Sequence, residues 1–153
     1  MHMMIQAALL AAAMTFAGTS GSAKSSGETP LATTASDPAL QWGPCPPIFP
    51  EGCEIAVLHG DPALPNADVF LRVPAGYVIP PHRHTSAERM ILVTGRLQAQ
   101  YKGAQATTLA PGSYAYGPAK LPHRASCISD HPCTLFIAFE GAVDAEAVAG
   151  TLD

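Results

Sequence analysis

The sequence predicts an all-β fold, a sandwich or barrel built from many short strands. Short apolar-rich runs recur through the chain after residue 53, and Gly and Pro interrupt them at short intervals. No long stretch there keeps the apolar period of about 3.6 residues that marks a surface helix. The chain has 153 residues, of which 48% are hydrophobic and 13% charged, and this suits one domain with one core.

The expected strands follow one another between residues 54 and 141. In chain order they cover residues 54–60, 67–74, 88–95, 96–103, 105–112, 113–118, 121–127 and 133–141. Apolar and polar residues alternate in 96–103, which is the period of a half-buried strand. Thr-Gly at 94–95 and Lys-Gly at 102–103 resemble hairpin turns.

The two ends of the chain differ from this region. Residues 1–23 hold an apolar run followed by small polar residues, typical of a secretory signal peptide, although no Lys or Arg precedes the run. A disordered Ala-rich tail is the alternative. Residues 24–53 are predicted to be a flexible linker and an irregular Pro-rich arm, in which proline excludes regular helix. Residues 142–153 are predicted to be a C-terminal tail, in which 142–150 can form a short helix.

Charge and segment length limit the partners. The net charge is -4 and the eight Lys and Arg residues are scattered, so nucleic acid is not an expected partner. The apolar run near the N-terminus is shorter than the roughly 20 residues that span a bilayer, so no stable membrane anchor is expected. The signal-like segment instead predicts a periplasmic or secreted protein.

Four cysteines form two close pairs, Cys45 with Cys53 and Cys127 with Cys133. An even number at short separations behind a signal-like segment favours two local disulfides and export. The alternative is buried free thiols in a cytoplasmic protein. Zinc binding by these cysteines is disfavoured, because neither pair has CxxC spacing.

Two histidines stand one residue apart, at His82 and His84. On a strand both imidazoles point to one face, and Arg83 points to the other. Glu88 follows after a segment long enough for a turn, which would bring the next strand alongside. His123 is a fourth candidate, from a later strand. Imidazoles and a carboxylate that converge are ligands for a divalent metal, and this donor set suits Fe, Mn, Ni, Zn or Cu.

These residues give the chain a resemblance to the cupin superfamily of small single-domain jelly rolls. The first cupin motif is matched at every position, by Gly76, His82, His84, Glu88 and Gly95. The second motif is matched at Gly112, Pro118 and His123. The resemblance implies a double-stranded β-helix (jelly-roll) barrel over residues 54–141, with the Pro-rich arm outside it.

The resemblance also implies a function. The metal ligands would be His82, His84, Glu88 and His123, and Glu88 would act either as a ligand or as a general base. The expected activity is that of a metal-dependent dioxygenase or lyase on a small oxygenated metabolite. The alternative is a non-enzymatic periplasmic protein that binds or senses a metal or small ligand. A homodimer is expected, since residues 134–139 are apolar on both faces of their strand.

Two positions depart from the second motif. Lys120 stands where cupins have Gly, and it is expected to be a solvent-facing turn residue at a cost of about 1 kcal/mol, the alternative being an ammonium at the pocket rim. Cys127 stands where they have Asn, and residues 127–133 resemble a hairpin loop closed by the disulfide. Tyr114 and Tyr116 share one face of their strand and are expected in the core, with the pocket wall as the alternative. His59 and His131 lack ligand spacing and are expected to be structural.

Overall fold

The computed structural model describes residues 29–152, and the chain after residue 32 forms a compact unit of its own. The predicted signal peptide, residues 1–23, lies outside the described residues. All regular structure in 29–152 is β-strand, which confirms the all-β prediction. In this part of the chain no helix has the length and apolar character needed to cross a membrane.

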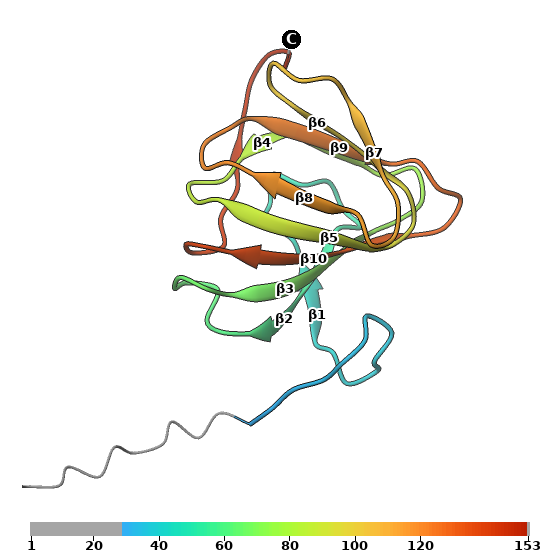
Figure 1. Ribbon diagram of the computed structural model, residues 1–153, viewed down its shortest axis with the longest axis vertical. Helices are drawn as coiled ribbons and strands as arrows, with labels where there is room; N and C mark the ends of the chain where they lie inside the picture. Colours follow the sequence, from blue (N-terminus) through green and yellow to red (C-terminus); the bar gives the residue numbers. More distant parts are fainter. Residues whose placement is uncertain (1–28, 153) are drawn as a thin grey trace, which may run out of the picture. The chain divides into compact units, whose positions relative to one another are not determined.

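The described residues contain eleven strands. They are β1 (Trp42–Pro44), β2 (Glu54–His59), β3 (Asp68–Val73), β4 (Val78–Arg83), β5 (Glu88–Thr94), β6 (Leu97–Tyr101), β7 (Thr107–Leu109), β8 (Tyr114–Gly117), β9 (His123–Cys127), β10 (Cys133–Phe139) and β11 (Glu146–Ala147). One sheet has the order β1-β2-β3-β10-β5-β8, and the other has the order β11-β4-β9-β6-β7. All pairings are antiparallel, and the two sheets face each other as the walls of a jelly-roll barrel (Figure 1).

The core lies between the sheets because each long strand alternates apolar residues toward the interior. In β10, Leu135 and Ile137 point inward and are buried, and β5 contributes Met90 and Leu92 beside them. β10 is central, since it pairs with β3 on one side and with β5 on the other. Its outer face carries Phe136, which is half-buried. That a second copy of the chain covers this face stays a prediction.

Two loops connect strands that the sequence had suggested were hairpin partners. The turn at 102–103 does join paired strands, β6 and β7. The turn at 94–95 does not, because β5 and β6 belong to different sheets, so this hairpin prediction was wrong. Gly95 makes the crossing possible: its φ is +87°, and an added Cβ would lie 2.7 Å from the sulfur of Cys133.

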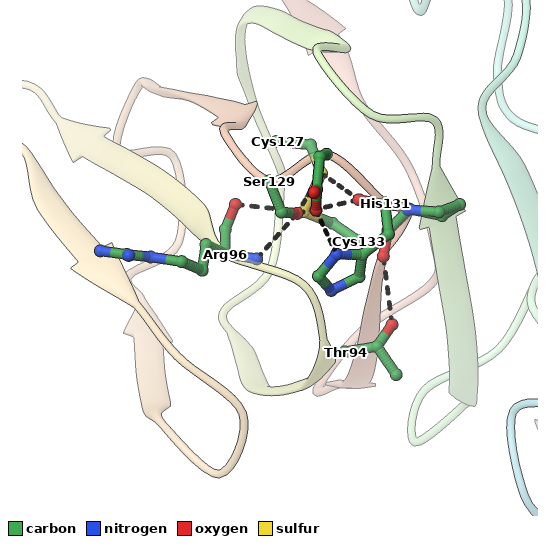
Figure 2. Close-up of a disulfide and its surroundings, with 8 residues drawn as sticks. Thr94, Arg96, Cys127, Ser129, His131 and Cys133 are labelled. Carbon is green, nitrogen blue, oxygen red and sulfur yellow. Dashed lines mark hydrogen bonds and ion pairs between the residues drawn. A yellow bond between two sulfur atoms is a disulfide. The ribbon is translucent and has the colours of Figure 1, made fainter.

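Both predicted disulfides are present, Cys45–Cys53 and Cys127–Cys133. The second joins the end of β9 to the start of β10, which lie in different sheets, so the hairpin interpretation of 127–133 was wrong. Figure 2 shows the loop around this bond, where the Ser129 hydroxyl accepts a hydrogen bond from the Arg96 amide at 3.1 Å and donates one to the His131 carbonyl at 2.8 Å. The disulfide therefore ties the two sheets together at one end of the barrel.

The Pro-rich arm and the C-terminal tail both add an edge strand. β1, within the arm, pairs with β2 and places the Trp42 ring 3.9 Å from the guanidinium of Arg72. β11 pairs with β4, so the short helix predicted over 142–150 is wrong. A helix this short is marginal by itself, and here the chain gains strand contacts instead, such as the bond from the Val148 amide to the Pro81 carbonyl at 3.0 Å.

Tyr114 and Tyr116 are not in the core. Their exposed fractions are 58% and 50%, so the prediction that they pack inside was wrong. β8 is the edge strand of its sheet, and it turns Ala115 and Gly117 toward the barrel interior. The small inward residues leave room for larger side chains from β5, and Glu88 is the direct partner of Gly117.

Candidate metal centre

The structure brings all four predicted ligand residues into the barrel interior. His82 is in β4, His84 directly follows β4, and Glu88 and His123 are the first residues of β5 and β9. Their exposed fractions lie between 2% and 8%. β4 and β9 are paired, with His82 opposite His123. β5 lies in the other sheet, so Glu88 reaches the histidines across the barrel and not from the neighbouring strand that the sequence had suggested.

The ligand atoms of these side chains lie close together. One nitrogen of each of His82, His84 and His123 lies within 4.8 Å of the others. The two carboxylate oxygens of Glu88 lie 3.3 Å from Nε2 of His84 and 3.3 Å from Nε2 of His123. Ligand atoms that share one ion at about 2.0–2.2 Å lie no more than about 4.4 Å apart. Among the described residues, the three histidines form the mutually close group, and Glu88 lies beside two of them, His84 and His123.

Hydrogen bonds fix which nitrogen of each imidazole faces the centre. Nδ1 of His82 lies 2.7 Å from the Pro80 carbonyl and Nδ1 of His123 lies 3.1 Å from the Leu121 carbonyl, while Nδ1 of His84 contacts the Asp144 carbonyl. A carbonyl only accepts, so Nδ1 carries the proton and Nε2 of the neutral ring holds a free electron pair. Such carbonyl contacts orient histidine ligands in metal sites.

Burial sets the protonation of these groups. It lowers the pKa of His82 to about 4 and, together with the charge of His82, that of His123 to about 3. It raises the pKa of Glu88, against the opposing influence of His84. The pKa of the Tyr101 phenol is raised by burial and then by the charge of Glu88. Near neutral pH His82 and His123 are therefore neutral, the form that binds metal.

We expect the metal-free protein to lose stability as the pH falls from 6.5 toward 4.5. The unfolded chain protonates His82 and His123 near pH 6.5, and the folded protein does not, so acid favours unfolding. Glu88 acts in the opposite sense, because the folded protein keeps a proton there that the unfolded chain releases above about 4.5. Glu88 offsets at most one of the two histidine protons, so the net slope lies between about 1.4 and about 2.7 kcal/mol per pH unit.

Urea unfolding of EDTA-treated protein at pH 7, 6 and 5 measures this slope. The variant His131→Ala is the control, since that side chain is exposed and lies in the loop after β9, and its slope should match the wild type. A free energy of unfolding that stays constant or rises as the pH falls would contradict the assignment of neutral, buried imidazoles.

Several residues that support the centre carry no sequence signal of their own. Phe49, from the Pro-rich arm, stacks edge-on against His82 with ring centroids 5.0 Å apart, and Phe139 does the same for His84 at 5.4 Å. Tyr101 lies 5.1 Å from the ring of His123. Gly117 was recognisable only as a Gly-Pro pair near the second motif, and its role depends on the register with β5.

Lys120 takes the glycine-like backbone of the second motif. Its φ is +63° and its side chain is exposed, as expected for a turn lysine, and it is not among the residues that line the cavity. Its amide donates a hydrogen bond to the His84 carbonyl at 2.8 Å. The strained turn thus holds the backbone of one candidate ligand.

A cavity lies between the sheets next to the four ligand residues. Its walls are apolar side chains of both sheets, together with Phe49 and Pro46 of the arm and residues 143–145 of the tail. The space open to water centres is about 60 Å³. A bound ion would therefore have a small apolar chamber beside it.

Comparisons with known proteins agree with this fold. A family model, the ChrR cupin-like domain, matches residues 32–143. A cupin-2 domain from Rhodospirillum rubrum has a similar structure, with a TM-score of 0.62 and 17% identity over 80% of this chain and 84% of that one. No curated protein matches the sequence.

Two enzymes have related structures. The DMSP lyase DddQ from Ruegeria pomeroyi DSS-3 aligns with a TM-score of 0.59 and 21% identity over 71% of this chain and 60% of that one. An oxalate oxidase aligns with a TM-score of 0.56 and 16% identity over 65% and 57%. The alignments span only 63% and 60% of the DMSP lyase chains, and identities this low show the fold alone. From the family match and the shared barrel, we conclude that this chain belongs to the ChrR cupin-like domain family of the cupin superfamily.

Proposed function

We propose that this protein is a metal-dependent cupin enzyme that acts on a small oxygenated metabolite, by dioxygenase-type or lyase-type chemistry. One observation carries the proposal: three imidazoles with free Nε2 electron pairs and one buried carboxylate converge beside a cavity. The ligands would be His82, His84, Glu88 and His123. They would leave one or two positions of a five- or six-coordinate ion for a substrate.

The arrangement of charge supports a cation at this point. Nε2 of His84 and Nε2 of His123, both without a proton, face the oxygens of Glu88 at 3.3 Å. Two electron-rich atoms at that distance repel each other when neither a proton nor a cation lies between them. In addition, Glu88 Oε1 is buried and accepts no hydrogen bond from any described residue, which is costly for a carboxylate. A divalent ion removes both penalties, and Fe, Mn, Ni, Zn and Cu all accept these donors.

The chemistry follows from that ion and from the residues around it. A divalent ion would act as a Lewis acid toward a carbonyl or enolate oxygen of the substrate. Glu88 would hold the ion or, when displaced from it, accept a proton as a general base. The apolar walls of the cavity would limit the access of water. Structures of a lyase and of an oxidase on the same fold are compatible with either reaction type.

A second candidate function is a non-enzymatic periplasmic protein that binds or senses a metal or small ligand. The two disulfides favour it, since they are typical of an oxidising compartment, where ferrous iron is less easily supplied. Export, which we propose on the same ground, is tested by fractionating cells that express the full chain and locating the protein by immunoblot. Recovery in the cytoplasm with free thiols would overturn it.

Metal content tests the proposed site directly. We expect about one transition-metal ion per chain by elemental analysis of the purified protein. His82→Ala and Glu88→Ala should lower the metal content at least ten-fold, because each removes a ligand and leaves buried partners unsatisfied. His131→Ala, an exposed histidine paired with Asp130, should leave it unchanged. Equal metal in wild type and in both site variants would overturn the proposal.

Activity then separates the two candidate functions. The loaded protein is screened for O₂ uptake and for elimination products on β-diketones, catechols, thiols and short hydroxy acids. Turnover that disappears in His82→Ala supports an enzyme. Stoichiometric metal without turnover on any class supports a binding protein.

A further inference from the structure

We propose that the cavity binds a small monocarboxylate with an uncharged, apolar remainder, and that the Tyr101 hydroxyl donates a hydrogen bond to its carboxylate. This inference rests on the proposed metal centre, since it names the class of molecule that the same site would take. Three features of the cavity support it: its charge, its size and an unpaired hydroxyl.

The charge of the site favours a single anionic group. Three neutral imidazoles, the Glu88 carboxylate and one divalent ion carry a net charge of +1 at the metal centre, which one carboxylate bound there neutralises. Asp144, also in the lining, adds a negative charge that opposes a second carboxylate on the ligand. Among the described residues that line the cavity there is no Lys or Arg. A second carboxylate on the ligand would therefore be buried without a partner, and burying an unpaired charge costs several kcal/mol or more. Dicarboxylates are disfavoured on this ground.

A cationic group on the ligand has no partner either. The acidic lining residues are Glu88, which is proposed to hold the metal, and Asp144. The carboxylate of Asp144 is already engaged, because it accepts a hydrogen bond from the Thr85 amide at 2.9 Å and another from the Thr85 hydroxyl. The rest of the lining is mainly aliphatic and aromatic, such as Ile79, Met90 and Leu135. An uncharged apolar tail is the remainder that this surface fits.

The size of the cavity limits the length of that tail. The chamber has a volume of about 60 Å³, so a ligand of a few non-hydrogen atoms fits it best. Butanoate, which has six non-hydrogen atoms, matches this limit. Bicyclic aromatic compounds exceed it.

Tyr101 supplies the polar contact. It shares the inward face of β6 with Leu97 and Ala99, and all three line the cavity. Its hydroxyl is buried and has no hydrogen-bond partner among the described residues. Buried polar groups in proteins nearly always have such a partner. The ring lies 5.1 Å from that of His123, and the pKa of the phenol is raised by burial and also by the charge of Glu88, so Tyr101 lies beside the proposed ligands. A carboxylate held there would accept its hydrogen bond, and bonds to ionised groups are the stronger kind.

Calorimetric titration of the Co²⁺-loaded protein tests the proposal by measuring the affinity for three small carboxylates. Two of them have four carbon atoms and one has three. Butanoate carries one carboxylate and a methyl end, β-alanine replaces that end by an ammonium of equal size, and succinate adds a second carboxylate. We expect butanoate to bind at least ten-fold more tightly than either of the others.

Tyr101→Phe tests the hydroxyl in the same titration. The variant should bind Co²⁺ as the wild type does and butanoate about ten-fold more weakly. Tyr116→Phe is the matched control, because that tyrosine is exposed on β8 and should change neither value.

Each outcome has a distinct meaning. Co²⁺ that does not bind overturns the proposed metal centre and this inference together. Co²⁺ that binds with no preference for butanoate overturns the ligand class and leaves the metal centre standing. Normal butanoate binding by Tyr101→Phe overturns the role of the hydroxyl.

Discussion

Gly117→Ala is expected to lower the affinity for the metal at least ten-fold, although it changes no proposed ligand. Gly117 is paired with Glu88 across β8 and β5. A Cβ added to it would lie 2.8 Å from both Cγ and Oε1 of Glu88, closer than real contacts allow. The φ of Gly117 is not in the left-handed region, so the backbone accepts alanine and the strain falls on the carboxylate. A carboxylate displaced by such a clash loses its place among the ligands.

Metal titration followed by competition with a chelator measures this loss. Gly43→Ala is the matched control, because that glycine also lies in an edge strand and its added Cβ would meet nothing within 4 Å. Urea unfolding of both variants shows whether the fold is retained. If Gly117→Ala folds and binds metal like the wild type, then Glu88 is not held as a ligand in the position that the structure gives it.

Removal of the Cys127–Cys133 disulfide is expected to lower the free energy of unfolding by about 3–4 kcal/mol. Closing a loop of this size accounts for about 2 kcal/mol in the chain-entropy model. The remainder comes from packing, since both sulfurs are in the core, where each cysteine is only 1% exposed, and their loss leaves space beside Gly95. Because this bond joins the two sheets, its loss also loosens one end of the barrel.

The disulfide in the Pro-rich arm provides the comparison. Cys45–Cys53 closes a loop of similar length, 8 residues apart in sequence against 6, but Cys45 is only partly buried. Cys53 is buried in the core at 5% exposure, so the double variant Cys45→Ala with Cys53→Ala should lose the loop-closure part of about 2 kcal/mol and a smaller packing part than the inter-sheet bond. Urea unfolding in oxidising buffer measures both variants. Equal losses would show that packing around the inter-sheet bond contributes no more than packing around the bond in the arm, and no loss in either would contradict a stabilising role for the disulfides.

The sequence determined those features that depend on neighbouring residues or on spacing. Alternation placed His82 and His84 on one face of a strand, and the structure has both imidazoles inside the barrel. The short separations of the cysteines gave the correct disulfide pairs. Gly and Pro punctuation marked most strands, because turns need the conformations that these residues allow. None of these inferences required knowledge of which strands pair.

Tertiary structure decided the rest, because strand pairing and burial are non-local. A short loop such as 94–95 is compatible with a hairpin or with a crossing between sheets, and only the packing of Gly95 against Cys133 selects the crossing. The tail over 142–150 has no strong local preference and takes the form that the edge of β4 offers it.

The same reason explains the residues that the sequence did not reveal at the candidate site. Tyr101 lines the cavity and Gly117 lies against Glu88 because of their register with β9 and β5. Tyr114 is exposed because β8 ends its sheet. The type of a residue and its spacing from its neighbours indicate which interactions it can make. Whether it meets a partner depends on strands far away in the chain, and that is settled only when the two sheets close around the core.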